Sequence, residues 1–185
     1  MIQSRFFKNP KMGFETVGPP ITEEQINRAI PEEFSGKDQF VEFYLCHNGG
    51  LMSKNTHFYR DIFHKVGPND FNELYVHDFY SIPPNPDENL IDSMLSLKAA
   101  IRQGCGEMTY QGAGGGAYID FVDSHLLISG DASGDYIWIH IPSGRIRYVN
   151  FDFCSDDGPY EAAPSFIDFV SNLGIGLRPL PEGLA

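Results

Sequence analysis

The sequence has no run of about 18 apolar residues, no CxxC pair and few positive charges. The first absence excludes an ordinary membrane-spanning helix, and the N-terminal MIQSRFFKNPKMGF lacks the apolar stretch of a simple export signal. Cys46, Cys105 and Cys154 are odd in number and far apart, which indicates neither a disulfide framework nor a zinc knuckle. We therefore expect a cytoplasmic protein that has no membrane partner.

The shortage of positive charge is marked. The chain has 13 lysines and arginines against 25 aspartates and glutamates, which gives a formal net charge of -12. This charge repels the phosphate backbone, so nucleic acid is not expected as a direct ligand. The same charge attracts a basic protein partner, while solubility alone is the competing interpretation.

Length and composition predict one domain over residues 1–185. Hydrophobic residues make up 42% of the chain, which is enough for one full core, and no internal repeat is present. The only low-complexity patch is QGAGGGA, residues 111–117. Its loose GxGxxA is followed by YIDFV, which reads as a strand where a dinucleotide fingerprint requires a helix, so a loop is predicted.

Two helices are predicted near the N-terminus. In ITEEQINRAI, residues 21–30, Thr22 and Gln25 form a capping box, and Pro31 closes the helix. A second helix is predicted over KDQFVEFYLCHN, residues 37–48, because its apolar residues recur at helical spacing. Asn48, Gly49 and Gly50 follow, and these residue types tolerate the left-handed conformation that often ends a helix.

The adjacent Cys46 and His47 raise the possibility of a catalytic pair. Neighbouring helical residues project about 100° apart, so the two side chains cannot readily face each other as nucleophile and base. We therefore interpret Cys46 as a buried thiol at the end of a helix. The six histidines form neither an HExxH nor an HxH motif, and no metal site is predicted.

The rest of the chain predicts more sheet than helix. LYVHDFYSI, residues 74–82, alternates like one strand, and an amphipathic helix is expected over residues 87–101. HLLIS, YIWIHI and RIRYVNF predict an antiparallel meander with one apolar face, and a final helix is expected over residues 163–174. The DASGD turn at residues 131–135 fails the calcium-loop pattern, because Pro142 stands where a bidentate Glu belongs.

The order of these elements resembles the SMI1/KNR4 (SUKH) superfamily between about residues 20 and 173. TEEQINRAIPEEF leads to FVEFYLCHNGG, and an apolar strand with a "D..G" turn comes later. Segment 51–86, the glycine patch and the C-terminal GLRPLPEGLA do not match the family pattern. The matching residues are Thr22, Glu23, Glu24, Ile26, Phe43, Leu45, Asn48, Gly49, Gly50, Ile128, Asp131, Gly134, Asp135 and Ile137.

This resemblance implies an α+β fold, in which a mostly antiparallel β-sheet is flanked by α-helices. It implies no cofactor and, in bacteria, a role as an immunity protein that binds and neutralises a cognate polymorphic toxin. The motif residues would be structural: Gly49 and Gly50 would form the turn after the second helix, and Asp131, Gly134 and Asp135 would belong to the hairpin.

We expect a noncatalytic protein-binding function, with a basic toxin domain, such as a nuclease, as the partner. The interface residues predicted from the aromatic and acidic cluster after the last meander strand are Asp152, Asp156, Asp157, Tyr160 and Glu161, although a solvated loop is the competing interpretation. A regulatory or scaffold protein of the same fold is the alternative function. A small hydrolase that uses Cys46 or the histidines is the third.

Overall fold

The chain adopts an α+β fold in the computed structural model, as predicted. The structure describes residues 1–31, 34–53, 55–59, 73–85, 93–105, 115–131, 135–149 and 159–176. Its helices are α1 (Glu23–Ala29), α2 (Lys37–Cys46), α3 (Met94–Cys105), α4 (Gly115–Ser124) and α5 (Phe166–Ser171). Its strands are β1 (Ile2–Gln3), β2 (Gly13–Phe14), β3 (Gly50–Leu51), β4 (Thr56–Tyr59), β5 (Glu73–Tyr75), β6 (Asp78–Phe79), β7 (His125–Gly130), β8 (Tyr136–His140), β9 (Ile146–Val149), β10 (Tyr160–Ala163) and β11 (Leu173–Ile175).

One six-stranded sheet organises the molecule. Its order is β10-β9-β8-β7-β6-β3, and all its pairings are antiparallel. The predicted meander is confirmed as β7, β8 and β9. The single strand predicted over residues 74–82 is wrong, because β5 ends at Tyr75 in the three-stranded sheet β11-β4-β5, whereas β6 begins at Asp78 in the large sheet.

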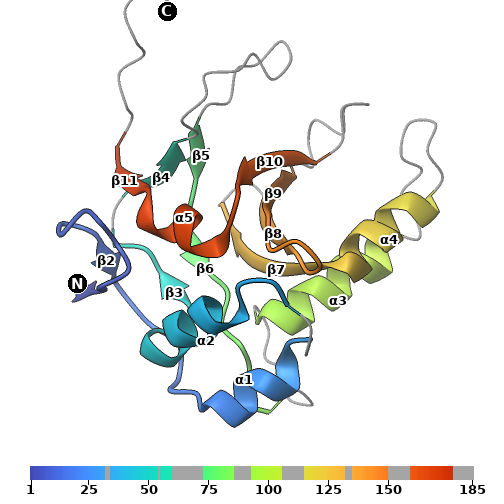
Figure 1. Cartoon of the computed structure of the whole chain (residues 1–185), viewed down its shortest axis with the longest axis horizontal. Coiled ribbons are helices and arrows are strands. Elements are labelled where there is room, and N and C mark those ends of the chain that lie inside the picture. The colour runs from blue at the N-terminus through green and yellow to red at the C-terminus, as the bar shows by residue number, and fades with distance from the viewer. Residues whose placement is uncertain are drawn as a thin grey trace, which may run out of the picture.

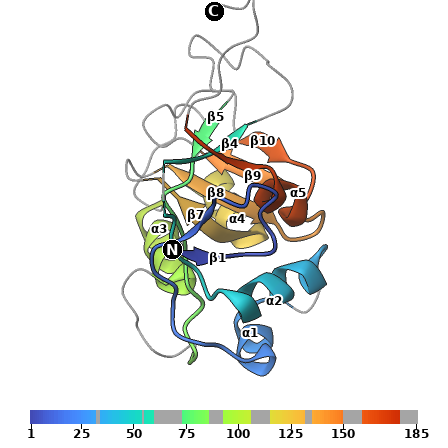
Figure 2. The same ribbon diagram turned by 90° about the vertical axis from the view of Figure 1, so that its left-hand side faces the viewer.

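Helices cover both faces of this sheet. Helices α1, α2 and α5 lie on one side, whereas α3 and α4 lie on the other (Figure 1 and Figure 2). The first side holds the aromatic core, in which the Phe43 ring centroid lies 5.2 Å from that of Phe79 and 5.3 Å from that of Phe166. On the second side, Phe121 packs edge-on against the fully buried Trp138. The prediction of one apolar face is therefore wrong for the middle of the meander.

Helix ends follow the sequence where their signals are local. The capping box of α1 is confirmed, since the Thr22 backbone N–H donates to Gln25 Oε1 at 2.8 Å and the Gln25 N–H donates back to Thr22 Oγ1. Helix α2 ends at Cys46, two residues earlier than predicted. Helix α5 is shorter than the predicted 163–174, because Ala163 ends β10 and Gly174 lies within β11.

The strand predicted at YIDFV is wrong, since these residues belong to α4. Helix α4 packs against α3 and β7, and this tertiary contact overrides the strand preference of the local residues. The loop predicted over residues 111–117 is wrong for its last three residues, because α4 begins at Gly115. The described element that precedes the patch is α3 and not a strand, which differs from a dinucleotide-binding unit. Residues 111–114 lie outside the described residues, as do residues 87–92 of the helix predicted over 87–101.

Candidate functional site

The turn after α2 joins two distant segments of the chain. Asn48 is 3% exposed, and its side-chain amide donates hydrogen bonds of 2.9 Å to the backbone carbonyls of Pro19 and Ile82. Its Oδ1 accepts the Ile82 N–H, also at 2.9 Å. One buried side chain therefore holds together the segment that precedes α1 and the segment that follows β6.

Glycines allow these segments to approach the turn. Gly49 and Gly50 have φ angles of +69° and +133°, which residues other than glycine rarely adopt. A Cβ atom at Gly49 would lie 2.5 Å from the Phe79 carbonyl oxygen, and one at Gly50 would lie 2.0 Å from the Thr16 carbonyl oxygen. The Asn48-Gly49-Gly50 motif is therefore a junction of three closely packed backbone segments.

An open groove lies at this junction, with a volume of about 230 Å³. Its walls come from the segments that Asn48 connects, and its floor includes β3. We call it the β3–β6 groove; its lining residues are Thr16, Val17, Gly18, Gly50, Leu51, Asp78, Phe79, Tyr80 and Ser81. Val17 is 39% exposed. This groove is not predicted from the sequence, although the glycine motif that contributes to it is.

Negative charge gathers beside the groove. Asp78 lines it, and the pKa of the neighbouring Tyr136 hydroxyl is raised first by burial and then by Asp131, Asp78 and Asp135. The ring centroids of Tyr136 and the lining residue Tyr80 lie 6.4 Å apart. The carboxylates near Tyr136 therefore also lie beside the groove. Among the described lining residues, no lysine or arginine is present.

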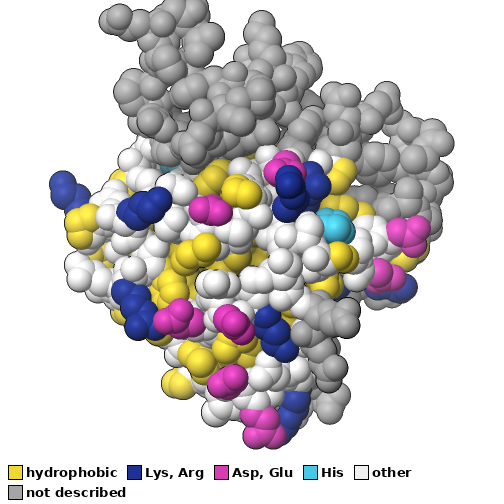
Figure 3. Space-filling model, in the orientation of Figure 1, with side chains coloured by type: hydrophobic (Ala, Val, Ile, Leu, Met, Phe, Trp, Pro, Cys, Tyr) yellow, Lys and Arg dark blue, Asp and Glu magenta, His cyan; other side chains and the backbone are white. Residues whose placement is uncertain are grey.

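The face that carries α1, α2 and α5 has a different charge pattern. Acidic and basic side chains are interspersed there and do not form a field of one sign (Figure 3). Ion pairs contribute to this pattern, since Glu24 pairs with Arg28 on α1 and Glu42 of α2 pairs with Arg5. A basic partner would therefore meet less net negative charge on that face than at the groove.

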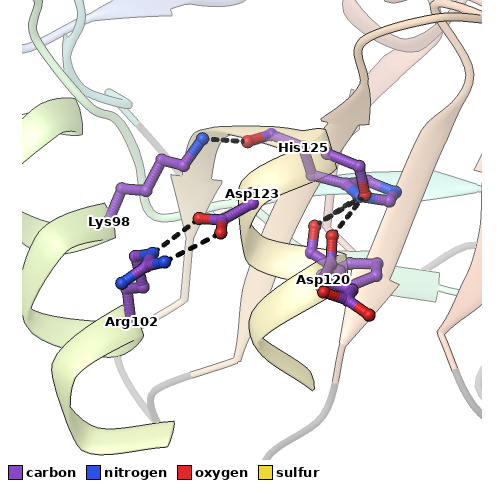
Figure 4. A network of polar contacts seen from close by, with 7 residues as sticks. Lys98, Arg102, Asp120, Asp123 and His125 are labelled. Carbon is purple, nitrogen blue, oxygen red and sulfur yellow. Dashed lines mark hydrogen bonds and ion pairs between the residues drawn. The ribbon is translucent and has the colours of Figure 1, made fainter. Parts of the chain in front are cut away.

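A second polar cluster connects α3, α4 and the start of β7 (Figure 4). Arg102 of α3 makes a bidentate contact with Asp123 of α4, at 2.6 and 2.9 Å, and this contact lowers the pKa of the Asp123 carboxyl. Lys98 Nζ donates to the His125 carbonyl at 2.6 Å, whereas the Asp120 carboxylate points away from the cluster. These contacts fasten two helices to the sheet, which is a structural role.

His125 makes folding stability depend on pH. Its ring stacks on Phe121 at 3.8 Å, and burial lowers its pKa to about 4, helped by the nearby charges of His140, Arg147 and Lys98. The unfolded chain takes up a proton near pH 6.5, so stability present above that pH is lost as the pH falls through about 4. We expect this residue to contribute a loss on the order of 2 kcal/mol.

Urea unfolding at several pH values, followed by the fluorescence of the single tryptophan, measures this dependence. In His125→Gln the titrating ring is absent, so the decrease in unfolding free energy between about pH 6.5 and 4 should be smaller than in the wild type. An unchanged decrease in the variant would show that His125 does not contribute to it.

Only some of the residues predicted to form the interface are among the described residues. Asp152, Asp156 and Asp157 lie outside the described residues, and Tyr160 begins β10. Glu161 is not a free carboxylate, since it accepts from Arg145 Nη1 at 2.6 Å and lies 3.5 Å from Arg147 Nη1. In the β7–β8 turn the Asp131 N–H donates to the Asp135 carbonyl, and the Asp135 N–H donates to Asp131 Oδ1; Gly134 lies outside the described residues.

The prediction of a buried thiol at Cys46 is wrong, because Cys46 is free and exposed. It occupies the last position of α2. His47 points instead into the core, 5.1 Å from the Phe14 ring centroid, and burial lowers the pKa of its imidazole. Because an exposed thiol is accessible whether or not it is catalytic, the substitution Cys46→Ala is the test that separates a hydrolase from a binding protein.

Comparisons with protein-family models, with curated proteins and with solved structures gave no match. Within the described part of the chain, no three or more His, Cys, Asp or Glu residues form a group that could hold a metal ion. None of the helices described is both long enough and apolar enough to cross a membrane.

Proposed function

We propose that this chain is a noncatalytic immunity protein of the SMI1/KNR4 type, which binds and neutralises a basic toxin domain. The observation that carries the proposal is the net charge of -12. A toxin that cleaves nucleic acid needs lysines and arginines to hold its substrate, and an acidic inhibitor complements the same surface. The groove adds a concave acidic feature to this overall charge.

The α+β fold and the Asn48-Gly49-Gly50 junction also support the proposal. The resemblance implies a mostly antiparallel sheet with flanking helices, and the chain has this architecture. The same resemblance assigns the glycines a structural role, and their positive φ angles and close contacts agree with one. Fold alone does not specify function, so the toxin itself has to be tested.

The test is titration of a toxin by the purified protein. Secreted proteins of competing strains are captured on the immobilised chain and eluted with salt, and each captured basic domain is then assayed for its own activity. We expect an equimolar amount of this chain to abolish that activity, with affinity that falls as salt rises. Cys46→Ala, which changes an exposed side chain, should neutralise the toxin as well as the wild type does.

Two results would contradict the proposal. If the captured domains keep their activity at saturating concentrations of this chain, neutralisation is wrong, and capture of an endogenous cytoplasmic protein would then favour the regulatory or scaffold function. If Cys46→Ala keeps its fold and partner affinity but loses biological activity, the chain is an enzyme.

A further inference from the structure

We propose that the β3–β6 groove is the surface that receives a cationic side chain, arginine or lysine, from an extended segment of the basic partner. The inference rests on the proposed function, because a basic toxin is the partner that presents such side chains. Four properties of the described residues support it: size, charge, rigidity and an apolar rim.

The size of the groove fits a side chain better than a cofactor. Its volume of about 230 Å³ is below the roughly 300–1,000 Å³ of typical small-molecule sites. It is also open along one side, as a site for a side chain attached to a larger partner must be. A single inserted anchor surrounded by flatter contacts is a common arrangement at protein interfaces.

The charge of the groove fits a cation. Asp78 lines the groove and is paired with His77 at 3.7 Å, a contact that carries charge on both sides only when the imidazole is protonated. Asp131 adds negative charge near the adjoining Tyr136. Carboxylates favour guanidinium and ammonium groups through Coulomb attraction and charge-assisted hydrogen bonds.

The walls of the groove are fixed before a partner arrives. Asn48 binds both segments that carry the walls, and the floor residue Gly50 contacts the backbone of Thr16 directly. Additional bonds hold the same junction, since the Glu15 N–H donates to the Leu51 carbonyl at 2.8 Å. A rigid groove loses little conformational entropy when it binds, which favours affinity.

The rim offers an apolar contact for the stem of the inserted side chain. Val17 is one of the few large hydrophobic residues with substantial exposure among the described residues, at 39%. Lysine and arginine place their methylene stems against such surfaces while their charged ends reach a carboxylate. Val17 and Asp78 therefore supply the two parts of one recognition site.

The probe is a capped hexa-arginine peptide, which is titrated into isotope-labelled wild-type protein and followed through backbone amide chemical shifts. We expect the largest shifts at the groove residues 16–18, 50–51 and 78–81. Shifts centred on residues 152–161 would assign the cation to the acidic cluster predicted from the sequence instead, and shifts spread evenly over the surface would show nonspecific attraction only. Either result overturns the proposal.

Two matched pairs of variants test the site by calorimetry with the same peptide. Val17→Arg places a cation at the rim and should weaken binding about tenfold, whereas Leu45→Arg, at an exposed residue of α2 outside the groove lining, should weaken it less than about threefold. Asp78→Asn should weaken binding more than Asp120→Asn, although both remove one negative charge. Equal effects within each pair would overturn the proposal, and the wild-type titration remains decisive if a variant misfolds.

Failure of the groove and failure of the proposed function give different results. If Val17→Arg neutralises a toxin as well as Leu45→Arg does, the toxin binds elsewhere and the groove proposal is wrong while the immunity function stands. If the peptide binds in the groove but no basic toxin is neutralised, the groove recognises cations and the immunity function is wrong.

Discussion

Gly50→Ala is expected to destabilise the fold by at least about 4 kcal/mol, which is a large part of the total stability of a domain this size. The added Cβ atom would lie 2.0 Å from the Thr16 carbonyl oxygen and 2.8 Å from Val17 Cα, and both are backbone atoms that cannot move aside as a flexible side chain can. The φ angle of +133° adds strain that only glycine avoids. Urea unfolding, followed by tryptophan fluorescence, measures the loss.

Gly36→Ala is the matched control for this prediction. Gly36 also has a positive φ, +84°, but its new Cβ would lie 3.7 Å from the nearest atom, Gln39 Oε1. Gly36→Ala should therefore lower the free energy of unfolding only through its unfavourable φ angle, by about 1–2 kcal/mol. Gly104→Ala, in helix α3 with nothing within 4 Å of the new Cβ, should stabilise the protein by up to about 1 kcal/mol. Equal losses for Gly50→Ala and Gly36→Ala would show that close backbone contact does not govern Gly50.

The parts of the fold that the sequence predicted correctly are those determined by neighbouring residues. The capping box needs only Thr22 and Gln25, three positions apart, and the meander needs only alternation within each strand and a short turn between strands. Each of these features depends on contacts between residues that are close together in the sequence. The α+β class was expected from the resemblance to the SMI1/KNR4 superfamily, and the structure has that class.

The errors occur where distant contacts decide the outcome. YIDFV has the residues of a strand, yet Phe121 packs against Trp138 and the following Asp123 binds Arg102, and these contacts hold the segment as a helix on the sheet. The end of α5 was misplaced because Gly174 pairs with His57 in β4, more than 100 residues away in the chain. The exposure of Cys46 depends on which side of α2 faces the core.

The candidate site shows the same division. The sequence identified Asn48, Gly49 and Gly50 as a turn, because amide and glycine residues after a helix have a local meaning. It did not identify what the turn holds, since the partners of the Asn48 side chain, Pro19 and Ile82, lie 29 and 34 residues away. A groove formed by such contacts has no signature in any one segment of the sequence.

Asn48→Ala is expected to lower the free energy of unfolding by about 3–5 kcal/mol. Three hydrogen bonds are lost, and the Ile82 N–H and C=O, which Asn48 satisfies in the buried interior, are left without these bonds. Each buried group left unpaired costs about 1–3 kcal/mol, which is more than the net value of an ordinary hydrogen bond. The same urea unfolding experiment measures this loss.

Asn172→Ala provides the matched control, because it removes the same side chain at an exposed position. The Asn172 amide donates to the Asp168 carbonyl at 2.8 Å, and its Oδ1 accepts from Lys8 Nζ at 2.9 Å. Water can replace both partners at this exposed position, so the loss should stay below about 1 kcal/mol. If the two variants lose the same free energy, Asn48 does not hold the junction. Asn48 also fixes both walls of the groove. A folded Asn48→Ala protein should therefore bind the hexa-arginine peptide more weakly than Asn172→Ala does. Equal binding by the two variants would show that the groove forms without Asn48.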